Sequence, residues 1–280
     1  MYTLAQFKND YPTDDVCLER IFKPQPCSCG RNKWYRIKSR PVYSCACGKQ
    51  VNPLKGTIFE KSTTPLTTWF YVMYLMSQSK SGISASMIHR LIGGSYKTSW
   101  RMCHKIRELM KDDTELFSGA VEADETFFSA KPWRNSRVPK GRSAFFKAPI
   151  VFGVVERSTG RVKAQVIPDL KTSTVFIALR DSVELGSDLY TDGGWAYRLA
   201  KVHYNHTPRI HWKTFKQAEN GFIPASGDST QQIENFWSQL KRGIYGVYRK
   251  VKYLQAYVDE FSFRYSNRYG DIFGELVARL

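Results

Sequence analysis

The chain has 280 residues, of which 42% are hydrophobic and 14% aromatic, so it can build a packed core and wholesale disorder is excluded. At this length we expect two or three compact units rather than one. Lysine and arginine outnumber aspartate and glutamate by 42 to 25, and the net charge of +17 favours a polyanionic partner, nucleic acid before an acidic membrane surface.

The start of the chain has no signal-peptide pattern, and its longest apolar stretch, residues 66–76, is about half as long as a membrane span. We therefore expect no membrane insertion. Three regions are predicted from changes in composition: 1–60, 61–115 and 116–280.

Four of the six cysteines lie close together in the first region, as the pairs Cys27-Ser-Cys29-Gly and Cys45-Ala-Cys47-Gly. Bunched pairs in a chain without secretory features favour metal binding over disulfides. The alternatives are a reduced, metal-free hairpin or disulfides. Short aromatic and aliphatic runs between the pairs, residues 34–37 and 42–44, predict two hairpin strands. No packing partner is evident for the first fifteen or so residues.

Residues 64–112 have the periodicity of helices. Thr64 is a candidate N-cap with Pro65 at the first helical position, and further helices are expected over 83–91 and from the break at 93–95 to about residue 110.

Two helices joined by a short glycine-containing turn are typical of a helix-turn-helix. Its exposed side would present Tyr96, Lys97, Arg101 and Lys105 to bases or phosphates. The alternative is a three-helix packing unit without DNA contacts.

From about residue 119 the pattern changes to strands, and the remaining elements alternate. We expect strands at 120–128, 150–156, 161–167 and 188–191, and helices at 173–183, 231–250 and 252–268. This order predicts a mixed α/β domain.

Three acids stand out by their context. Asp124 lies inside an apolar strand, Asp192 ends a strand before two glycines, and Glu234 opens a helix. The spacing in that helix predicts one buried stripe, formed by Ile233, Phe236, Trp237, Leu240 and Ile244. Three such carboxylates are suited to two Mg²⁺ ions about 4 Å apart. Lys241, two helical turns after Glu234, would contact a phosphate. The alternative interpretation is a set of ordinary surface acids at strand and helix ends.

Several motifs together resemble one known family. Val121-Glu-Ala-Asp-Glu-Thr-Phe, Tyr190-Thr-Asp-Gly-Gly-Trp-Ala-Tyr, the run from Ile233 to Gly246 and the helix from Leu254 to Arg268 resemble DDE transposases of a bacterial insertion-sequence group related to Merlin elements, the ISXO-like transposases. The resemblance covers about residues 20–270. It implies an RNase H-like fold with mixed sheet and flanking helices.

The same resemblance implies that Asp124, Asp192 and Glu234 hold two Mg²⁺ or Mn²⁺ ions and that Lys241 is the lysine following the glutamate. One departure lies nearby. Where relatives carry a His-Thr-Asn run, this chain reads Ser-Thr-Gln, ending at Gln231.

Neighbouring acids on the first strand are alternatives to Asp124. Strand alternation puts Glu122 on the same face as Asp124, whereas Glu125 points the other way and is expected to be structural.

The cysteine pairs resemble the zinc ribbon that heads these transposases. Cys27, Cys29, Cys45 and Cys47 would hold Zn²⁺, because four thiolates favour tetrahedral zinc and a head with little core needs such a staple. The usual spacing leaves two residues between paired cysteines, and this chain has one. Of the isolated cysteines, Cys103 is expected to pack in the core.

Three runs rich in basic residues contain no acid, and flanking the predicted acids they favour contacts with the DNA backbone. The alternative for each is a solvated surface. The runs comprise Lys131, Arg134, Arg137, Lys140, Arg142 and Lys147; then Arg198, Lys201, Arg209, Lys213 and Lys216; then Lys241, Arg242, Arg249, Lys250 and Lys252.

Together these features predict a DNA transposase. It would bind the terminal inverted repeats of its element, hydrolyse phosphodiester bonds there, and transfer the freed 3′-hydroxyls to target DNA without a covalent protein intermediate. Pairing two ends requires at least a homodimer. The alternatives are a non-catalytic DNA-binding protein derived from a transposase, and a ribonuclease acting on RNA–DNA hybrids. The expected location is the cytoplasm at the nucleoid in a bacterium, or the nucleus in a eukaryote.

Overall fold

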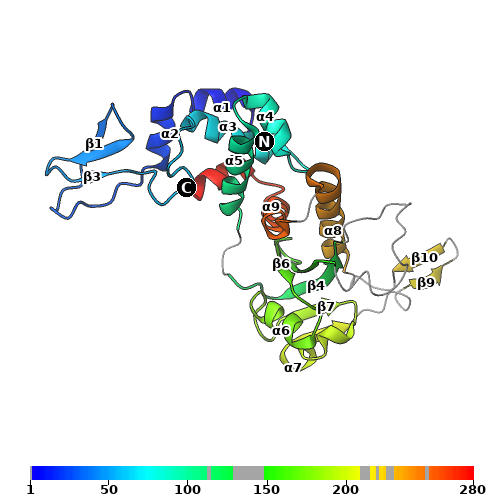
Figure 1. The fold of residues 1–280 in the computed structure, drawn as a ribbon. Coiled ribbons are helices and arrows are strands. Elements are labelled where there is room, and N and C mark those ends of the chain that lie inside the picture. Colours follow the sequence, from blue (N-terminus) through cyan, green and yellow to red (C-terminus); the bar gives the residue numbers. More distant parts are fainter. Residues whose placement is uncertain are drawn as a thin grey trace. The chain divides into compact units, whose positions relative to one another are not determined.

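The computed structural model describes residues 2–111, 115–128, 148–208, 215–218, 221–224, 230–249 and 252–280. The chain divides into two compact units, the first formed by Met1–Leu109 with Tyr269–Leu280 and the second by Met110–Arg268 (Figure 1). No helix in these ranges is both long and apolar enough to span a membrane.

The first unit contains a small three-stranded sheet and a group of helices. Its elements are α1 (Leu4–Asp10), α2 (Asp14–Ile21), β1 (Trp34–Ile37), β2 (Val42–Cys45), β3 (Gln50–Val51), α3 (Leu66–Gln78), α4 (Ala85–Ile92), α5 (Tyr96–Glu108) and α10 (Ile272–Ala278). The hairpin β1–β2 agrees with the prediction, and β3 extends it on the β2 side.

An aromatic cluster joins the two ends of the chain within this unit. The ring of Phe7 on α1 stacks on Tyr74 of α3 at a centroid distance of 5.1 Å and meets Phe273 of α10 edge-on at 5.8 Å. The early residues thus have a partner that the sequence did not reveal. The third region was predicted to run to residue 280, but Tyr269–Leu280 belongs to the first unit, because α10 packs on α3.

The predicted cap of α3 is wrong by one residue. Pro65, not Thr64, is the N-cap, and it makes no side-chain capping bond. A residue before proline is disfavoured in helical conformation, which keeps Thr64 outside the helix. Asp14 of α2 supplies the missing acceptor: its Oδ1 accepts both the backbone N–H and the hydroxyl of Thr67, each at 2.8 Å.

The predicted helix–turn–helix segment has well-defined helix ends. Ser84 caps α4 and Ser95 caps α5, each accepting a backbone N–H with its hydroxyl. Between the helices Gly93 and Gly94 have φ of +73° and +72°, a conformation that side-chain-bearing residues rarely adopt.

The second unit is built on a five-stranded mixed sheet of order β6-β5-β4-β7-β8. Strands β6, β5 and β4 are antiparallel, while β4, β7 and β8 are parallel. Its elements are β4 (Ala120–Phe127), β5 (Ile150–Glu156), β6 (Val162–Ile167), α6 (Thr172–Arg180), β7 (Asp188–Thr191), η2 (Trp195–Tyr197), α7 (Ala200–His203), β8 (Asn205–Pro208), β9 (Phe215–Ala218), β10 (Gly221–Pro224), α8 (Gln231–Gly243), the π-helical turn η4 (Ile244–Tyr248) and α9 (Leu254–Ser266).

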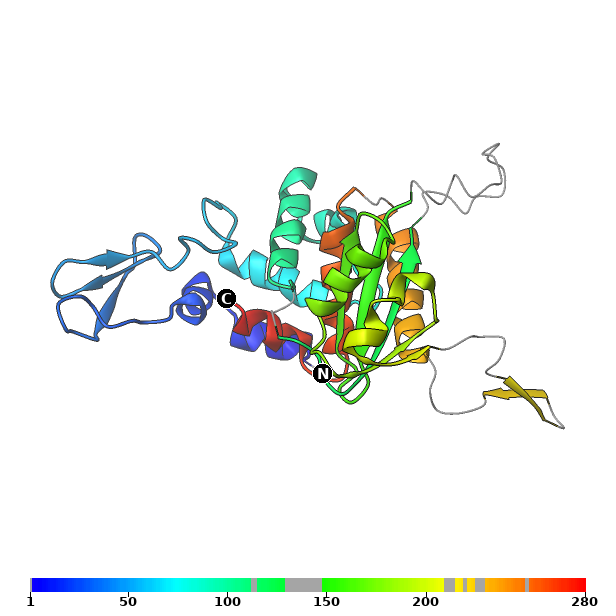
Figure 2. The same ribbon diagram turned by 90° about the horizontal axis from the view of Figure 1, so that it is seen from below.

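Helices cover both faces of this sheet, giving two apolar layers (Figure 2). One layer packs side chains of α6, η2 and α7 against the sheet. The other packs α8 and α9, and it contains the whole stripe predicted for α8: Ile233, Phe236, Trp237, Leu240 and Ile244. The sheet therefore holds its strand ends, and the start of α8, in fixed positions.

Candidate functional site

Asp124 lies on β4, and Asp192 directly follows the neighbouring parallel strand β7. Strand β4 pairs with β7 so that Glu122 is opposite Tyr190. If this register is continued for two more residues, past the end of β7, it matches Asp124 with Asp192. Adjacent strands are about 4.8 Å apart, so the register brings the two aspartates to neighbouring positions.

Glu234 comes to the same region from α8. It lies in the first turn of that helix, where a negative charge is favourable, and its Oε1 accepts the hydroxyl of Thr230 at 3.2 Å. One turn later Trp237 donates its indole N–H to Oδ2 of Asp124 at 2.9 Å. This bond ties α8 directly to the strand that carries Asp124.

The charges of the three predicted acids interact. Burial raises the pKa of Asp124 to about 6, and the negative charges of Asp192 and Glu234 add to this rise. Among the described residues, however, the ligand atoms of these acids do not all lie within 4.8 Å of one another. Carboxylate oxygens are the donors that hard divalent cations take.

Glu125 faces the opposite side of β4, as the alternation predicted. Its Oε2 accepts the hydroxyl of the buried Tyr197 at 2.7 Å. Burial raises the pKa of Glu125 to about 7, and the charges of Asp124 and Asp192 contribute. The carboxyl of Glu125 is therefore near Asp124 and Asp192, and its bond to Tyr197 anchors η2.

Glu122, the alternative ligand on β4, makes hydrogen bonds to α8 and to Arg157. Its carboxylate is buried, and its Oε2 accepts the backbone N–H groups of Gln232 and Ile233 at 3.0 and 3.1 Å. Its Oε1 accepts the Nε–H of Arg157 at 3.0 Å, and the guanidinium of Arg157 lies 3.8 Å from the ring centroid of Tyr190. This carboxylate thus holds the N-terminus of α8 against β4.

Two residues, Gly153 and Trp237, support Asp124 through contacts that were not predicted from the sequence. Gly153 on β5 pairs directly with Asp124, and a Cβ there would lie 2.7 Å from the ring of Trp237. The absent side chain of Gly153 therefore makes room for the indole that donates to Asp124. The spacing of Trp237 from Glu234 was visible in the sequence, but its partner across the sheet was not.

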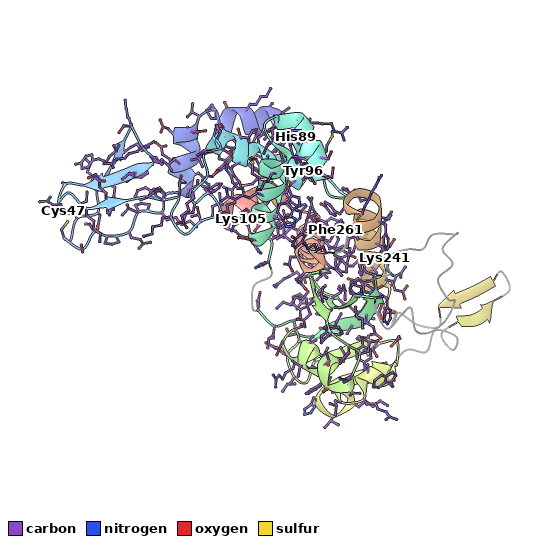
Figure 3. The ribbon with its side chains drawn as sticks, in the orientation of Figure 1. Cys47, His89, Tyr96, Lys105, Lys241 and Phe261 are labelled. Carbon is purple, nitrogen blue, oxygen red and sulfur yellow. The ribbon has the colours of Figure 1, made fainter. Side chains whose placement is uncertain are left out.

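Two of the basic residues predicted near this site, Lys241 and Arg242, lie on α8. Lys241 is half-buried, two turns after Glu234 (Figure 3), and Arg242 is exposed with its Nε–H donated to the carbonyl of Ser238. Gln231 is the first residue of α8 and is exposed.

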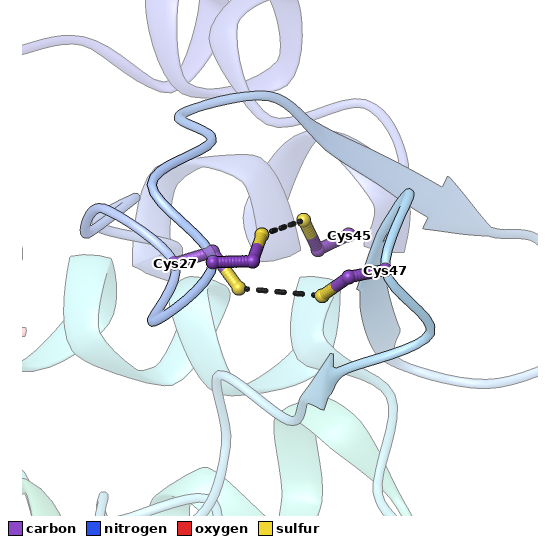
Figure 4. A group of neighbouring side chains, drawn as sticks. Cys27, Cys45 and Cys47 are labelled. Carbon is purple, nitrogen blue, oxygen red and sulfur yellow. Dashed lines mark hydrogen bonds between the residues drawn. The ribbon is translucent and has the colours of Figure 1, made fainter.

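The four predicted zinc ligands form a compact cluster. The sulfur atoms of Cys27, Cys29, Cys45 and Cys47 all lie within 4.8 Å of one another. The Cys27–Cys47 and Cys29–Cys45 sulfur distances are 3.6 and 3.7 Å (Figure 4). Tetrahedral zinc with Zn–S bonds of about 2.3 Å requires sulfur separations of about 3.8 Å, so the four thiols fit this ion despite their shortened spacing.

The four thiols differ in how readily they lose their protons, and this bears on cation binding. The backbone N–H of Cys29 is the largest cause that lowers the pKa of Cys27 to about 6. For Cys45 the N–H of Cys47 acts in the same direction, but burial and the other three thiols outweigh it and raise the pKa to about 11. Four thiolates this close together need a positive ion to be deprotonated at once.

Of the residues predicted to contact DNA from α5, three are exposed and one is paired. Tyr96, Lys97 and Arg101 are exposed, whereas Lys105 makes an ion pair of 2.9 Å with Glu108 (Figure 3). Nine further basic residues predicted to contact DNA lie outside the described residues: Lys131, Arg134, Arg137, Lys140, Arg142, Lys147, Arg209, Lys213 and Lys250.

Comparison with known proteins places this site in a family. The model of the ISXO2-like transposase domain matches residues 116–266, more than half of the chain. An uncharacterized protein in transposable element ISH50 of Halobacterium salinarum is 28% identical over 176 residues, which is 58% of this chain and 58% of that relative.

A structural neighbour is the cryo-EM structure of a simian T-cell lymphotropic virus intasome with PP2A regulatory subunit B56 gamma. It is 16% identical, with a TM-score of 0.28 over 62% of this chain and 60% of that chain, which is too low to establish a shared fold. The family match covers the strands, the acids and α8, and it confirms the resemblance drawn from their motifs. The chain therefore belongs to the ISXO2-like transposase family.

Proposed function

We propose that this protein is a DNA transposase that cuts phosphodiester bonds at the ends of its element with two divalent metal ions and transfers the freed 3′-hydroxyls to target DNA. The observation that carries this proposal is the placement of Asp124 on β4, beside the strand β7 that Asp192 follows and bonded to Trp237 of α8, one turn after Glu234. The match to a transposase family supports it independently. The antiparallel-then-parallel sheet, with helices on both faces, supports an RNase H-like architecture.

Each residue has a definite role in this proposal. Asp124, Asp192 and Glu234 would hold the two ions, which when bound activate a water or 3′-hydroxyl and stabilise the leaving oxygen. Trp237 fixes the orientation of the Asp124 carboxylate by donating to its Oδ2. Lys241 would contact a phosphate beside the bond to be cut.

We also propose that the first unit recognises the terminal inverted repeats. The zinc ribbon and the exposed residues Tyr96, Lys97 and Arg101 of α5 would contact DNA, and the excess positive charge of the chain supports phosphate binding. Bringing two ends together would require at least two copies of the protein.

The test is cleavage of a duplex that carries the terminal repeat flanking the coding sequence. The full-length protein is incubated with Mg²⁺ or Mn²⁺, and the control omits the divalent ion rather than adding a chelator, which would also remove zinc. We expect metal-dependent cuts at the repeat end.

Asp124→Asn, Asp192→Asn and Glu234→Gln should each abolish cutting while DNA affinity stays within a few-fold of the wild type. Glu184→Gln, a change at an exposed glutamate, is the matched control. Wild-type cutting by any of the three variants would reject that residue as a ligand. Tight binding without cutting under either metal would instead favour the non-catalytic DNA-binding protein.

A further inference from the structure

The indole of Trp195 is 62% exposed, three residues after Asp192. By contrast, Trp69 and Trp237 are 1% and 5% exposed. Tryptophan carries the largest apolar surface of any side chain, so one that stands in solvent beside a candidate site marks a surface for a partner.

The exposed surface continues along the chain. Leu199, between η2 and α7, and Val202, in α7, are 41% and 77% exposed. Arg198 and Lys201 are also exposed, and residues 193–208 contain no acid. We call Trp195, Arg198, Leu199, Lys201 and Val202 the Trp195 surface.

The opposite side of this segment is anchored in the core. Tyr197 is 1% exposed and donates its hydroxyl to Glu125 of β4. Before it, the backbone N–H of Gly194 is donated to Oδ1 of Asp192 at 2.8 Å. Three residues span at most about 11 Å, so Trp195 is held within that distance of Asp192 from Cα to Cα.

The positive charge of the Trp195 surface indicates the kind of partner that it would bind. An aromatic ring flanked by cations, with no acid nearby, matches a nucleic-acid strand, whose phosphates pair with the cations and whose bases stack on the ring. Bases inside a duplex are already stacked on their neighbours, so only an unpaired base offers its face to a side chain.

We propose that Trp195 stacks on an unpaired nucleobase beside the phosphate to be cut, while Arg198 and Lys201 contact the flanking phosphates. This inference rests on the proposed function. It extends that function, because it requires the two DNA strands to separate at the element end, next to Asp192. The ligand is a single-stranded nucleotide tail, whatever its sequence.

The probe is a duplex of arbitrary sequence with a four-nucleotide single-stranded tail and 2-aminopurine at the first unpaired position, compared with the same duplex blunt-ended. Binding to the full-length protein is measured without added divalent ion, so that no cutting is needed. The variants are Trp195→Leu, which keeps apolar bulk without a ring, and Trp195→Phe, which keeps a ring.

We expect the wild type and Trp195→Phe to prefer the tailed duplex and to quench 2-aminopurine fluorescence. Trp195→Leu should lose roughly 5- to 150-fold in affinity for the tailed duplex, the range of one base–aromatic contact, with blunt binding unchanged. Leu185→Ala is the matched control and should bind like the wild type. Leu185 is 60% exposed and precedes β7, at the end of that strand away from Asp192.

Equal tail binding by the wild type and Trp195→Leu would overturn the inference, as would an equal loss in the leucine and phenylalanine variants. A change of oligomeric state in Trp195→Leu with unchanged DNA binding would assign the surface to a protein interface instead. Because the assay needs no cutting, failure of the proposed function is recognised separately, by a wild type that binds tails but cleaves no DNA with metal.

Discussion

Glu122 on β4 accepts the backbone N–H of Ile233 at the start of α8, at a distance of 3.1 Å. This bond places a buried carboxylate at a helix N-terminus, where the helix dipole favours negative charge. Through Arg157, which also lies over the ring of Tyr190, the same carboxylate is linked to β7. One acid that binds no ion in our proposal therefore ties together the three elements that carry Asp124, Asp192 and Glu234.

Replacing Glu122 should disturb the site through this link. Glu122→Ala should lower the free energy of unfolding by about 1–3 kcal/mol, because it removes the buried acceptor of two helix N–H groups and of the partly exposed Arg157. Glu122→Gln should cost less stability, yet still slow cutting at unchanged DNA affinity, because α8 loses a charged cap beside Glu234. Urea unfolding and single-turnover cleavage measure the two effects, and wild-type values in both would contradict the role.

Gly153→Ala should displace Trp237. A Cβ at position 153 would lie 2.7 Å from the indole ring, so the ring must move away from Asp124. We expect a loss of about 1–3 kcal/mol in the free energy of unfolding, typical of overpacking, together with slower cutting. Gly246→Ala is the matched control, since its Cβ would meet nothing within 4 Å. Equal stability of the two variants would argue against the close contact.

Removing one cysteine of the cluster should remove the bound metal. Atomic absorption of the purified wild type should find one zinc per chain, and Cys29→Ser or Cys47→Ser should lose it, because a hydroxyl is a poor replacement for a thiolate. Cys103→Ala, at a buried cysteine outside the cluster, should keep its zinc. Full zinc content in either serine variant would exclude that cysteine as a ligand.

Asp124 and Glu125 should make the protein less stable as the pH rises. The pKa values of Asp124 and Glu125 are raised to about 6 and about 7 from 3.8 and 4.5. The stabilisation linked to their protonated forms is complete below the ordinary values and is lost as the pH rises through 6 to 7. Without added divalent ion, the wild type should therefore lose more stability between pH 5 and pH 8 than Asp124→Asn, measured by urea unfolding. Equal losses would contradict the raised pKa of Asp124.

The elements nearest the site were predictable because their patterns are local. The apolar strand around Asp124, the strand before Asp192 and the stripe of α8 each follow a period that the sequence displays, and β5 and β7 have their predicted bounds. Strand β8 was missed, because Asn205–Pro208 shows no alternation at the edge of the sheet. The role of Glu122 and the fit of Trp237 over Gly153 depend on contacts between distant segments, which no local period encodes.

The return of the chain end to the first unit has a consequence for synthesis on the ribosome. Chains emerge N-terminus first, and domains generally fold as they appear. Here Phe273, which packs on Phe7 and Tyr74, is made after the whole second unit, Met110–Arg268. The aromatic cluster of the first unit can therefore form only after α10 has been synthesised. A polypeptide that stops before α10 would leave that unit incomplete.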